Sequence, residues 1–520
     1  MFDSHSRTTV VFLSLIALFL YFQLFRFPFT PILFEGDHAV HLSNAWRMFQ
    51  GEVAFRDFFL FTFPGTEIFY LSFFKLFGVK IWMLNITILF LILCLSAVGL
   101  YFSRTLLKGL AVYLPVTFFV VFEIRTLGID GSHRFFSVLF VFLAIAVLLT
   151  QRTPMRLFSA GLLCGVASCF TQPRGLLGIA AIILFLFVEK LYKRQNLLSL
   201  IKSVLWVFSP FALVVGFTSL YFIISAGFET YYFSTFVFPV KHYPADVWNN
   251  PKAYLKDIPN IGTLSLSFYL RQTTPMLFNY FLIPLIYIVF FVVLWFRGQT
   301  ISTEKKLQLI LINLAGLLLA IGVFSAPNSI RFYQVSLPGL ISLIWIFQHF
   351  FEFPKITFSL LLVLGLLGFA YTFQRATVPI HCLETPSGTI ASLSSETLAR
   401  YQWVAEHTRP GDYLYEPHHP SLYMMFHLRN PTPLPLIRPN NYTTPEQVKA
   451  IIEGLERNPP RYIIWDGFWD TFDSNESPDF HLEPLVVYVH NNYHLVKKLD
   501  YDSDSKSKVV EYRIEIWEKR

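Results

Sequence analysis

The sequence has 520 residues, of which 54% are hydrophobic and only 14% are charged, and its mean hydropathy is +0.50. This composition excludes an ordinary soluble globular protein, in which about 25% of residues are charged. The net charge of +7 does not indicate nucleic-acid binding, because most lysines and arginines of the first three quarters lie in short loops between apolar runs, where basic residues orient membrane helices.

Apolar runs recur as far as Phe373, each long enough to cross a hydrocarbon core about 30 Å thick. By this length rule they predict about eleven spans, at 8–26, 81–103, 109–124, 134–150, 156–171, 175–190, 201–226, 275–296, 307–325, 334–351 and 355–373. With a cytoplasmic N-terminus, the inner loops collect mainly lysine and arginine, as the positive-inside rule requires. We therefore expect an integral protein of a bacterial inner or plasma membrane. An odd number of spans exports the C-terminal part to the periplasm or cell exterior.

The first outer loop, residues 27–80, is too long for a tight turn and too polar to span the membrane. Residues 37–50 and 65–77 have the patterns of amphipathic helices, and we expect both to lie along the membrane surface. The apolar side of the first helix is formed by Val40, Ala45, Met48 and Phe49. Pro64 and Gly65 break the chain between the two helices.

Asp37 and Asp130 are the candidate catalytic residues. Asp37 begins the first surface helix, where the positive end of the helix favours the ionised carboxylate that a general base requires. Aspartate is also a preferred N-cap, so a capping role is the alternative. Asp130 lies on the next outer loop, where it either shares an acceptor hydroxyl or a cation with Asp37 or is a solvated loop acid.

Other polar residues gather on the predicted outer side, whereas the inner side has almost only bases. Ionisable groups at a membrane boundary cost free energy, so such a cluster indicates function. Arginine and lysine suit phosphate groups, which indicates an anionic substrate. The candidate substrate-binding residues are Glu35, His41, Arg56, Asp57, Glu67, His133, Arg134, Gln172, Arg174, Lys241 and Arg331.

A divalent cation is the one cofactor that the sequence suggests, because histidines accompany the outer acids. The candidate ligands are Glu67 and His242, although no HExxH motif supports them. Three of the four cysteines lie in apolar runs, so neither a disulfide framework nor a CxxC metal site is expected. The sequence also lacks a GxSxG elbow, a phosphate loop and a GxGxxG fingerprint.

Residues 374–520 have the charge, proline and turn content of a soluble domain, which divides the chain into a membrane domain, 1–373, and an exported α/β domain. Helices are predicted after Ser394 and after Thr444, where Pro445 takes the first helical position. Strands are predicted in DYLYE, RYIIWD, YHLVKKLD and VVEYRIEIWEK. The aromatic stretch from Trp465 to Asp470 either stacks on a sugar ring or packs at the rim of the domain.

Residues 35–78 resemble the first periplasmic loop of GT-C membrane glycosyltransferases, above all of the family 39 group, which includes protein mannosyltransferases and the aminoarabinose transferases of lipid A. The matching positions are Asp37, Ala45, Gly51, Asp57, Pro64 and Leu76-Phe77-Gly78. The chain departs from the family pattern at Pro64-Gly65, usually a double proline or lysine-proline, and at Glu35-Gly36-Asp37, usually an Asp-Glu pair.

The resemblance implies a GT-C fold and transfer of a hexosyl or pentosyl group from a polyprenyl phosphate to a hydroxyl of a lipid, glycan or protein, with inversion at the anomeric carbon. Asp37 is then the base and Asp130 the second acid. The donor phosphate is bound by Arg134, Arg174, Lys241 and Arg331. No nucleic acid is expected as a partner.

Two other classes of protein compete with the enzyme. A lipid or glycan transporter also has many helices with buried charges, but it predicts related repeats in the two halves. A non-catalytic assembly or sensing protein would not need acids and arginines on several outer loops.

Overall fold

The computed structural model describes residues 4–34, 36–124, 129–246, 249, 281–297, 301–324, 329–350, 354–418, 420–467, 480–500 and 513–520. The chain divides into two compact units. The helical unit comprises Met1–Gln23, Thr87–Leu220 and Asn250–Ala376. The mixed unit comprises Leu24–Ile86, Tyr221–Asn249 and Thr377–Arg520.

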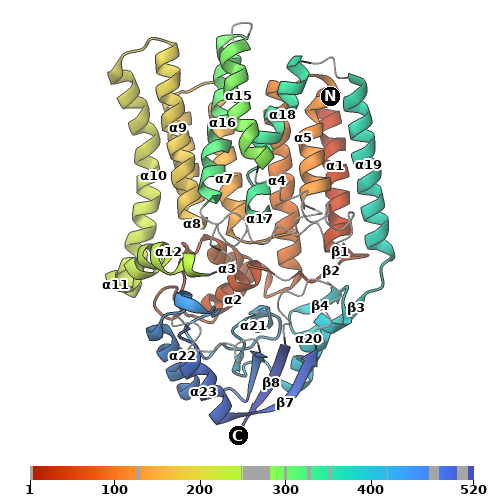
Figure 1. Ribbon diagram of the computed structural model, residues 1–520, viewed down its shortest axis with the longest axis vertical. Helices are drawn as coiled ribbons and strands as arrows, with labels where there is room; N and C mark the ends of the chain where they lie inside the picture. Colours follow the sequence, from red (N-terminus) through yellow and green to blue (C-terminus); the bar gives the residue numbers. More distant parts are fainter. Residues whose placement is uncertain are drawn as a thin grey trace, which may run out of the picture. The chain divides into compact units, whose positions relative to one another are not determined.

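The helical unit is a bundle of long apolar helices that run side by side (Figure 1). Six helices in the described residues are long and apolar enough to cross a membrane: α1 (Ser4–Leu24), α4 (Trp82–Leu106), α9 (Gln172–Tyr192), α10 (Leu197–Ala226), α16 (Thr303–Val323) and α19 (Pro354–Thr377). Shorter apolar helices are α7 (His133–Leu148), α8 (Pro154–Phe170), α15 (Ile283–Arg297) and α18 (Leu337–Phe350). The short helix α5 (Leu114–Phe118) continues into a π-helical segment, Phe119–Ile124. Each predicted apolar run overlaps one of these segments, which confirms a polytopic helical membrane protein.

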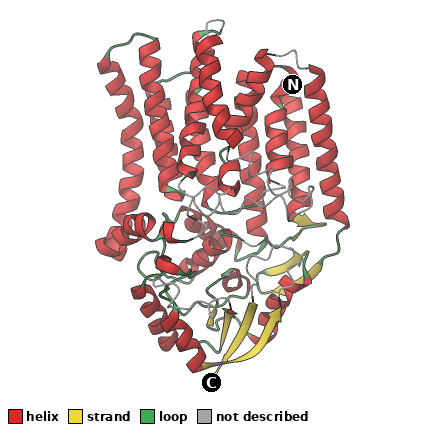
Figure 2. Ribbon diagram, viewed as in Figure 1, coloured by secondary structure: helices red, strands yellow, loops and turns green. Residues whose placement is uncertain are grey.

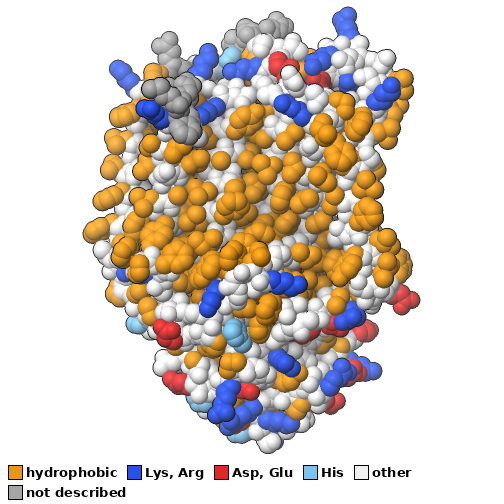
Figure 3. Space-filling view, turned by 180° about the vertical axis from the view of Figure 1, so that it is seen from behind, with side chains coloured by type: hydrophobic (Ala, Val, Ile, Leu, Met, Phe, Trp, Pro, Cys, Tyr) orange, Lys and Arg blue, Asp and Glu red, His pale blue; other side chains and the backbone are white. Residues whose placement is uncertain are grey.

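Small residues let these helices approach closely, as is common between membrane helices. A Cβ atom on Gly161 of α8 would lie 1.9 Å from the backbone oxygen of Val207 on α10, so only glycine fits there. On the outside of the bundle, hydrophobic side chains cover the sides of the helices, while lysines and arginines gather at the end that carries the N-terminus (Figure 3). This distribution is the one that the positive-inside prediction requires.

The mixed unit joins the first outer loop to the C-terminal part of the chain. Helix α2 (His38–Phe49) packs on α3 (Gly65–Phe77) and on α21 (Ser421–Met425). The indole N–H of Trp46 donates a hydrogen bond to the backbone carbonyl of Leu428 at 2.7 Å. The backbone N–H of Phe59 donates to the backbone carbonyl of Pro433 at 2.8 Å. The loop helices therefore fold against residues that are hundreds of positions away in the sequence.

Among the described residues, strands of the mixed unit form three small sheets (Figure 2). The antiparallel pairs are β1 (Phe25–Arg26) with β2 (Thr30–Pro31), and β3 (His381–Thr385) with β4 (Gly388–Ser392). A four-stranded sheet has the order β5 (Leu414–Tyr415), β6 (Tyr462–Asp466), β8 (Arg513–Lys519) and β7 (Tyr493–Asp500). Its β5–β6 pair is parallel and its other pairs are antiparallel.

Helices α20 (Ser395–His407), α22 (Pro445–Arg457) and α23 (Glu483–Asn492) accompany this sheet. The predicted helix starts are confirmed by their caps: Ser394 accepts a hydrogen bond from the N–H of Thr397, and Thr444 forms a capping box with Gln447. The core includes Ile451 and Leu455 of α22 and Ile463 of β6.

The structure bears on two expectations for side chains. The loop helices exist. Phe49, on the apolar side expected to lie along the membrane surface, is exposed, whereas polar residues such as Ser43 and Asn44 are fully buried. The reason is that α2 is covered by both α3 and α21. Trp465 is only 1% exposed and belongs to the core, which agrees with the packing alternative rather than with stacking on a sugar ring, while residues 468–470 lie outside the described part.

Candidate functional site

Asp130 is the centre of a buried polar network in the helical unit. It lies just before α7, whose N-cap is Ser132. The backbone N–H and the hydroxyl of Ser132 donate to the two carboxylate oxygens of Asp130 at 2.8 and 2.6 Å. Arg134, in the first turn of α7, approaches the same carboxylate at 3.3 Å. These contacts favour a role for Asp130 in orienting its neighbours.

Arg174 joins this network from the first turn of α9. Its guanidinium donates to the backbone carbonyl of Arg134 at 2.7 Å and to the side-chain oxygen of Gln334 at 3.1 Å. The amide nitrogen of Gln334 in turn donates to Asp130 at 3.4 Å. Gln334 is fully buried and lies between α17 (Ser329–Tyr333) and α18. Three separate stretches of the chain thus meet through their side chains.

The network has the electrostatic character of an anion site. Its four side chains, those of Asp130, Arg134, Arg174 and Gln334, comprise one carboxylate and two guanidinium groups. All four are at most 8% exposed, and electrostatic interactions are stronger in such a buried site than in water. The N-termini of α7 and α9 add partial positive charge at the same place. The arrangement therefore favours binding of a phosphate or similar anion.

Asp37 belongs to the mixed unit and occupies the N-cap position of α2. Its side chain is exposed and makes no capping hydrogen bond, so the capping alternative is not observed. Burial is the main cause of the raised pKa of Tyr442, and the negative charge of nearby Asp37 adds to it. Asp37 therefore lies close to a residue of the C-terminal part of the same unit.

His41 and Glu67 form a buried pair between α2 and α3. The imidazole Nδ1 and a carboxylate oxygen are 2.6 Å apart, and the Glu67 residue is completely inaccessible. His41 follows Asp37 by four residues, which places the two on the same side of a helix. The pair therefore fixes the first turns of α2 against the beginning of α3.

Arg56 and Asp57 contact each other in the loop between α2 and α3. Arg56 donates two hydrogen bonds to Asp57, at 2.9 and 2.7 Å. The hydrogen bonds from Arg56 and from the Val53 N–H hold the pKa of Asp57 below its usual value, although partial burial opposes this shift. The contacts stabilise a local turn.

The remaining predicted site residues are distributed over both units. His133 and Gln172 are half-buried first residues of α7 and α9, and Arg331 is a half-buried residue of α17. Lys241 is exposed at the end of α12 (Phe238–Lys241) in the mixed unit. Glu35 lies outside the described residues.

The metal candidates have protein partners. Glu67 contacts His41, and the Nδ1 of His242 lies 2.8 Å from the carbonyl oxygen of Asn441. In the part of the chain that the structure describes, no group of three or more His, Cys, Asp or Glu side chains is arranged to hold a metal ion. A divalent cation stays a prediction, and no chemical step below depends on one.

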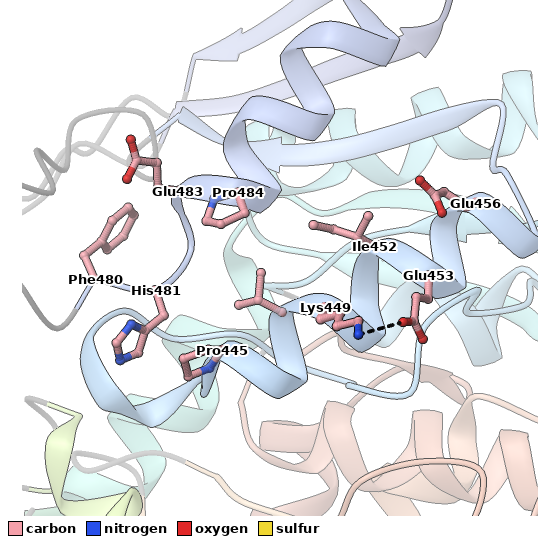
Figure 4. A pocket seen from close by; sticks show the side chains of 10 residues that line it. Pro445, Lys449, Ile452, Glu453, Glu456, Phe480, His481, Glu483 and Pro484 are labelled. Atoms are coloured by element: carbon pink, nitrogen blue, oxygen red, sulfur yellow. Dashed lines mark ion pairs between the residues drawn. The ribbon is translucent and has the colours of Figure 1, made fainter.

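A surface pocket of about 650 Å³ lies in the mixed unit beside α22 and α23 (Figure 4). Its lining includes an apolar floor of Val448 and Ile452 and an ion pair between Lys449 and Glu453 at 3.9 Å. None of the predicted site residues lines it.

Gln334 and Ser132 were not predicted from the sequence. Gln334 is a polar residue at the predicted outer end of a span, three positions after Arg331, and this position was an available signal. Ser132 lies two residues after Asp130 and just before a predicted span. Serine at such a position is a common helix N-cap.

No protein-family model matches the sequence, and the comparison with curated proteins finds no match. Among solved structures, the oligosaccharyltransferase of Archaeoglobus fulgidus in complex with zinc and sulfate has a TM-score of 0.51 at 11% identity, over 95% of this chain and 80% of that chain. ArnT from Cupriavidus metallidurans bound to undecaprenyl phosphate has a TM-score of 0.49 at 12% identity, over 98% and 97%. The arabinofuranosyltransferase AftD from Mycobacteria has a TM-score of 0.48 at 13% identity, over 99% and 40%. The chain thus shares the fold of the archaeal oligosaccharyltransferase, and these solved structures are GT-C glycosyltransferases.

Proposed function

We propose that the protein is a membrane glycosyltransferase that moves a sugar from a polyprenyl-phosphate donor to an acceptor hydroxyl on the outer membrane face. The observation that carries the proposal is the buried network of Asp130, Arg134, Arg174 and Gln334, which brings two guanidinium groups to two helix N-termini. The fold shared with an oligosaccharyltransferase supports it.

In this proposal the network binds the donor phosphate. Arg134 and Arg174 stabilise the negative charge that grows on the phosphate oxygen as the glycosidic bond breaks. Asp130 and Gln334 orient the two guanidinium groups, and Lys241 and Arg331 contribute further positive charge. Asp130 keeps its proposed place in the catalytic site, as an orienting acid.

Asp37 is the proposed base. Its carboxylate takes the proton of the acceptor hydroxyl while the acceptor oxygen attacks the anomeric carbon. The bond from that carbon to the phosphate oxygen breaks, and the lipid phosphate leaves with the electron pair. A single displacement of this kind inverts the anomeric centre. Arg56, Asp57, His133, Gln172 and Glu35 are proposed to surround the substrates, and the buried His41–Glu67 pair to support this part of the site from the interior.

The proposed topology places these groups on one side of a bacterial inner or plasma membrane. By the length rule, about eleven spans lie within a membrane domain of residues 1–373, and residues 374–520 form an α/β domain outside the cell or in the periplasm. The acceptor is a lipid, a glycan or a protein. A divalent cation, with Glu67 or His242 as ligands, remains part of the proposal.

The test is turnover by the purified full-length protein in lipid bilayers, with polyprenyl-phosphate sugars as donors and mass spectrometry of the products. Asp37→Asn is expected to lower turnover about 10²- to 10⁴-fold, the usual contribution of a general base. Glu453→Gln, at an exposed ion pair on α22, is the matched control and should leave turnover unchanged. Full activity of Asp37→Asn would reject the proposed base.

The same preparation distinguishes an enzyme from a transporter. A transporter is the second hypothesis for a helical bundle with buried charges. A transporter would move the sugar lipid across the bilayer without forming a glycosylated product. Movement of intact donor without product, across all acceptors tried, would reject the transferase.

A further inference from the structure

A further helical stretch lies directly after α10 in the mixed unit. It consists of α11 (Phe228–Tyr232), a π-helical segment (Phe233–Val237) and α12 (Phe238–Lys241) (Figure 1). Gly227 separates it from α10 with a φ of 87°, a conformation that glycine adopts without strain. The chain can therefore change direction between α10 and this stretch, residues 228–241.

One face of the stretch is packed inside the mixed unit. Tyr231 and Phe238 are at most 8% exposed. The ring of Tyr231 lies 5.6 Å from that of Phe55, and the ring of Phe238 lies 4.7 Å from that of Phe59, both in the first outer loop. These aromatic contacts fix which side of the stretch faces outward.

The opposite face carries a row of large apolar side chains spaced four residues apart. Phe228 is 62%, Tyr232 44%, Phe236 57% and Val240 64% exposed. Phe228 stacks on Tyr232 with ring centroids 5.7 Å apart, and Tyr232 stacks on Phe236 at 5.3 Å. The row therefore forms one continuous apolar surface rather than scattered exposed residues.

The row contains no charge. Glu229 and Lys241 stand at its two ends, and no residue from 230 to 240 is charged. It also continues an exposed row at the end of α10, where Tyr221 is 60% and Ile224 75% exposed. Since α10 is a candidate membrane span, the apolar row continues a surface that faces lipid.

We propose that residues 228–241 lie in the interface of the bilayer, with Phe228, Tyr232, Phe236 and Val240 inserted among the lipids. Aromatic side chains favour this region, and a helix lying in it buries its exposed apolar face among the lipids. Exposed apolar rows of this size mark interaction surfaces, and continuity with α10 identifies the partner as lipid. The inserted row would hold the packed face, and with it the first outer loop, at a fixed depth. This inference does not depend on the proposed function.

The test is the depth of a nitroxide spin label in the full-length protein reconstituted in phosphatidylcholine–phosphatidylglycerol nanodiscs. The label is placed by Phe236→Cys in a background with Cys382→Ser, because Cys382 is the exposed cysteine among the described residues. Lys449→Cys on α22, whose side chain is 80% exposed, provides the aqueous control. The background protein without an introduced cysteine corrects for labelling of other sites.

At position 236 we expect the label to collide with oxygen more than with a water-soluble nickel chelate, and the control label to show the reverse order. A label at position 236 that behaves like the control would overturn the inference. So would a label shielded from both reagents, which would indicate a protein partner such as a second copy of the chain. If Phe236→Cys fails to fold, Val240→Cys tests the same row one turn later.

Discussion

Arg174 donates a hydrogen bond of 2.7 Å to the backbone carbonyl of Arg134, so a charged side chain ties the first turn of α9 to the first turn of α7. A carbonyl in the first turn of a helix normally accepts from within that helix, so this contact adds a partner from another span. Because Arg174 is buried and also contacts Gln334, the shape of its guanidinium group affects both the stability of the fold and the position of its positive charge.

Arg174→Lys is expected to reduce stability and activity together. A lysine keeps the charge, but its single ammonium group on a flexible stem does not reproduce a fork that reaches two acceptors. Loss of a hydrogen bond to a charged group costs about 1.5–3 kcal/mol. Thermal unfolding in detergent and donor turnover measure the two effects.

Arg461→Lys is the control, because Arg461 bonds Glu518 at an exposed position and such pairs contribute little. Equal thermal midpoints for Arg174→Lys and Arg461→Lys would show that the two hydrogen bonds of the Arg174 guanidinium are not needed for stability.

Gln334→Glu and Gln334→Met together test whether the positive charge of the two guanidinium groups binds the donor. Glutamate places a second carboxylate against Asp130 and lowers the net charge of the network by one, while it retains an acceptor for Arg174. Methionine removes both hydrogen bonds but keeps the charge. If charge binds the phosphate, the KM for the donor rises more in Gln334→Glu than in Gln334→Met.

The opposite order would mean that the hydrogen bonds of Gln334, rather than the charge of the network, support donor binding. Asn313→Leu, which removes another buried amide of the helical unit, corrects both variants for a general loss of packing.

The helices of the membrane part were predictable because each depends on its own sequence. An apolar run of sufficient length forms a helix in lipid whatever its neighbours, since its backbone groups must bond one another. The caps at Ser394 and Thr444 were predictable for the same local reason. The burial of α2 was not, because it depends on α21, which lies far along the chain.

The candidate site was predictable only in part, for a related reason. Topology and charge identified Asp130, Arg134 and Arg174, which the structure joins in one network. Gln334 depends on a contact between distant helices, and its position at the predicted outer end of a span does not indicate which residues it contacts. Hydrophobic periodicity likewise does not reveal that polar His41 faces Glu67 in the interior.

His418 predicts how the mixed unit responds to pH. Burial, assisted by the charges of Arg438 and Arg400, lowers the pKa of His418 from 6.5 to about 3. Asp466 lies at an ion-pair distance of 3.7 Å, but burial outweighs its attraction for the proton. Between pH 6.5 and 3 the unfolded chain therefore binds a proton that the folded protein excludes. The free energy of unfolding is thus undiminished above pH 6.5 and decreases as the pH falls below it.

His418→Gln should flatten this dependence. A fully excluded proton changes the free energy of unfolding by about 1.4 kcal/mol per pH unit. Thermal midpoints between pH 7.5 and 4.5 should thus fall less steeply in the variant than in the parent protein. His494→Gln, at an exposed histidine of β7, should keep the parent slope, and a parent slope in His418→Gln would contradict the prediction.

Arg47 connects the first outer loop to the C-terminal part, and its removal tests whether they form one cooperative unit. It donates to Glu52 at 2.7 Å and to the carbonyl of Thr432 at 2.8 Å, and it lies over the ring of Phe58. Arg47→Met keeps the length of the side chain but leaves Glu52 without its cation. Loss of one partner of a buried ion pair costs about 3–5 kcal/mol, and the partial exposure of Glu52 places the expected loss at the lower end.

Burial raises the pKa of Glu52 and Arg47 opposes that rise, so much of the loss should come from the stranded carboxylate. Adding Glu52→Gln to Arg47→Met should therefore recover part of the thermal midpoint. Limited proteolysis should cut both the first loop and residues 377–520 faster in Arg47→Met than in the parent protein. Faster cleavage of the loop alone would show that the two segments unfold independently, because a single cooperative unit exposes both when their shared contact is lost.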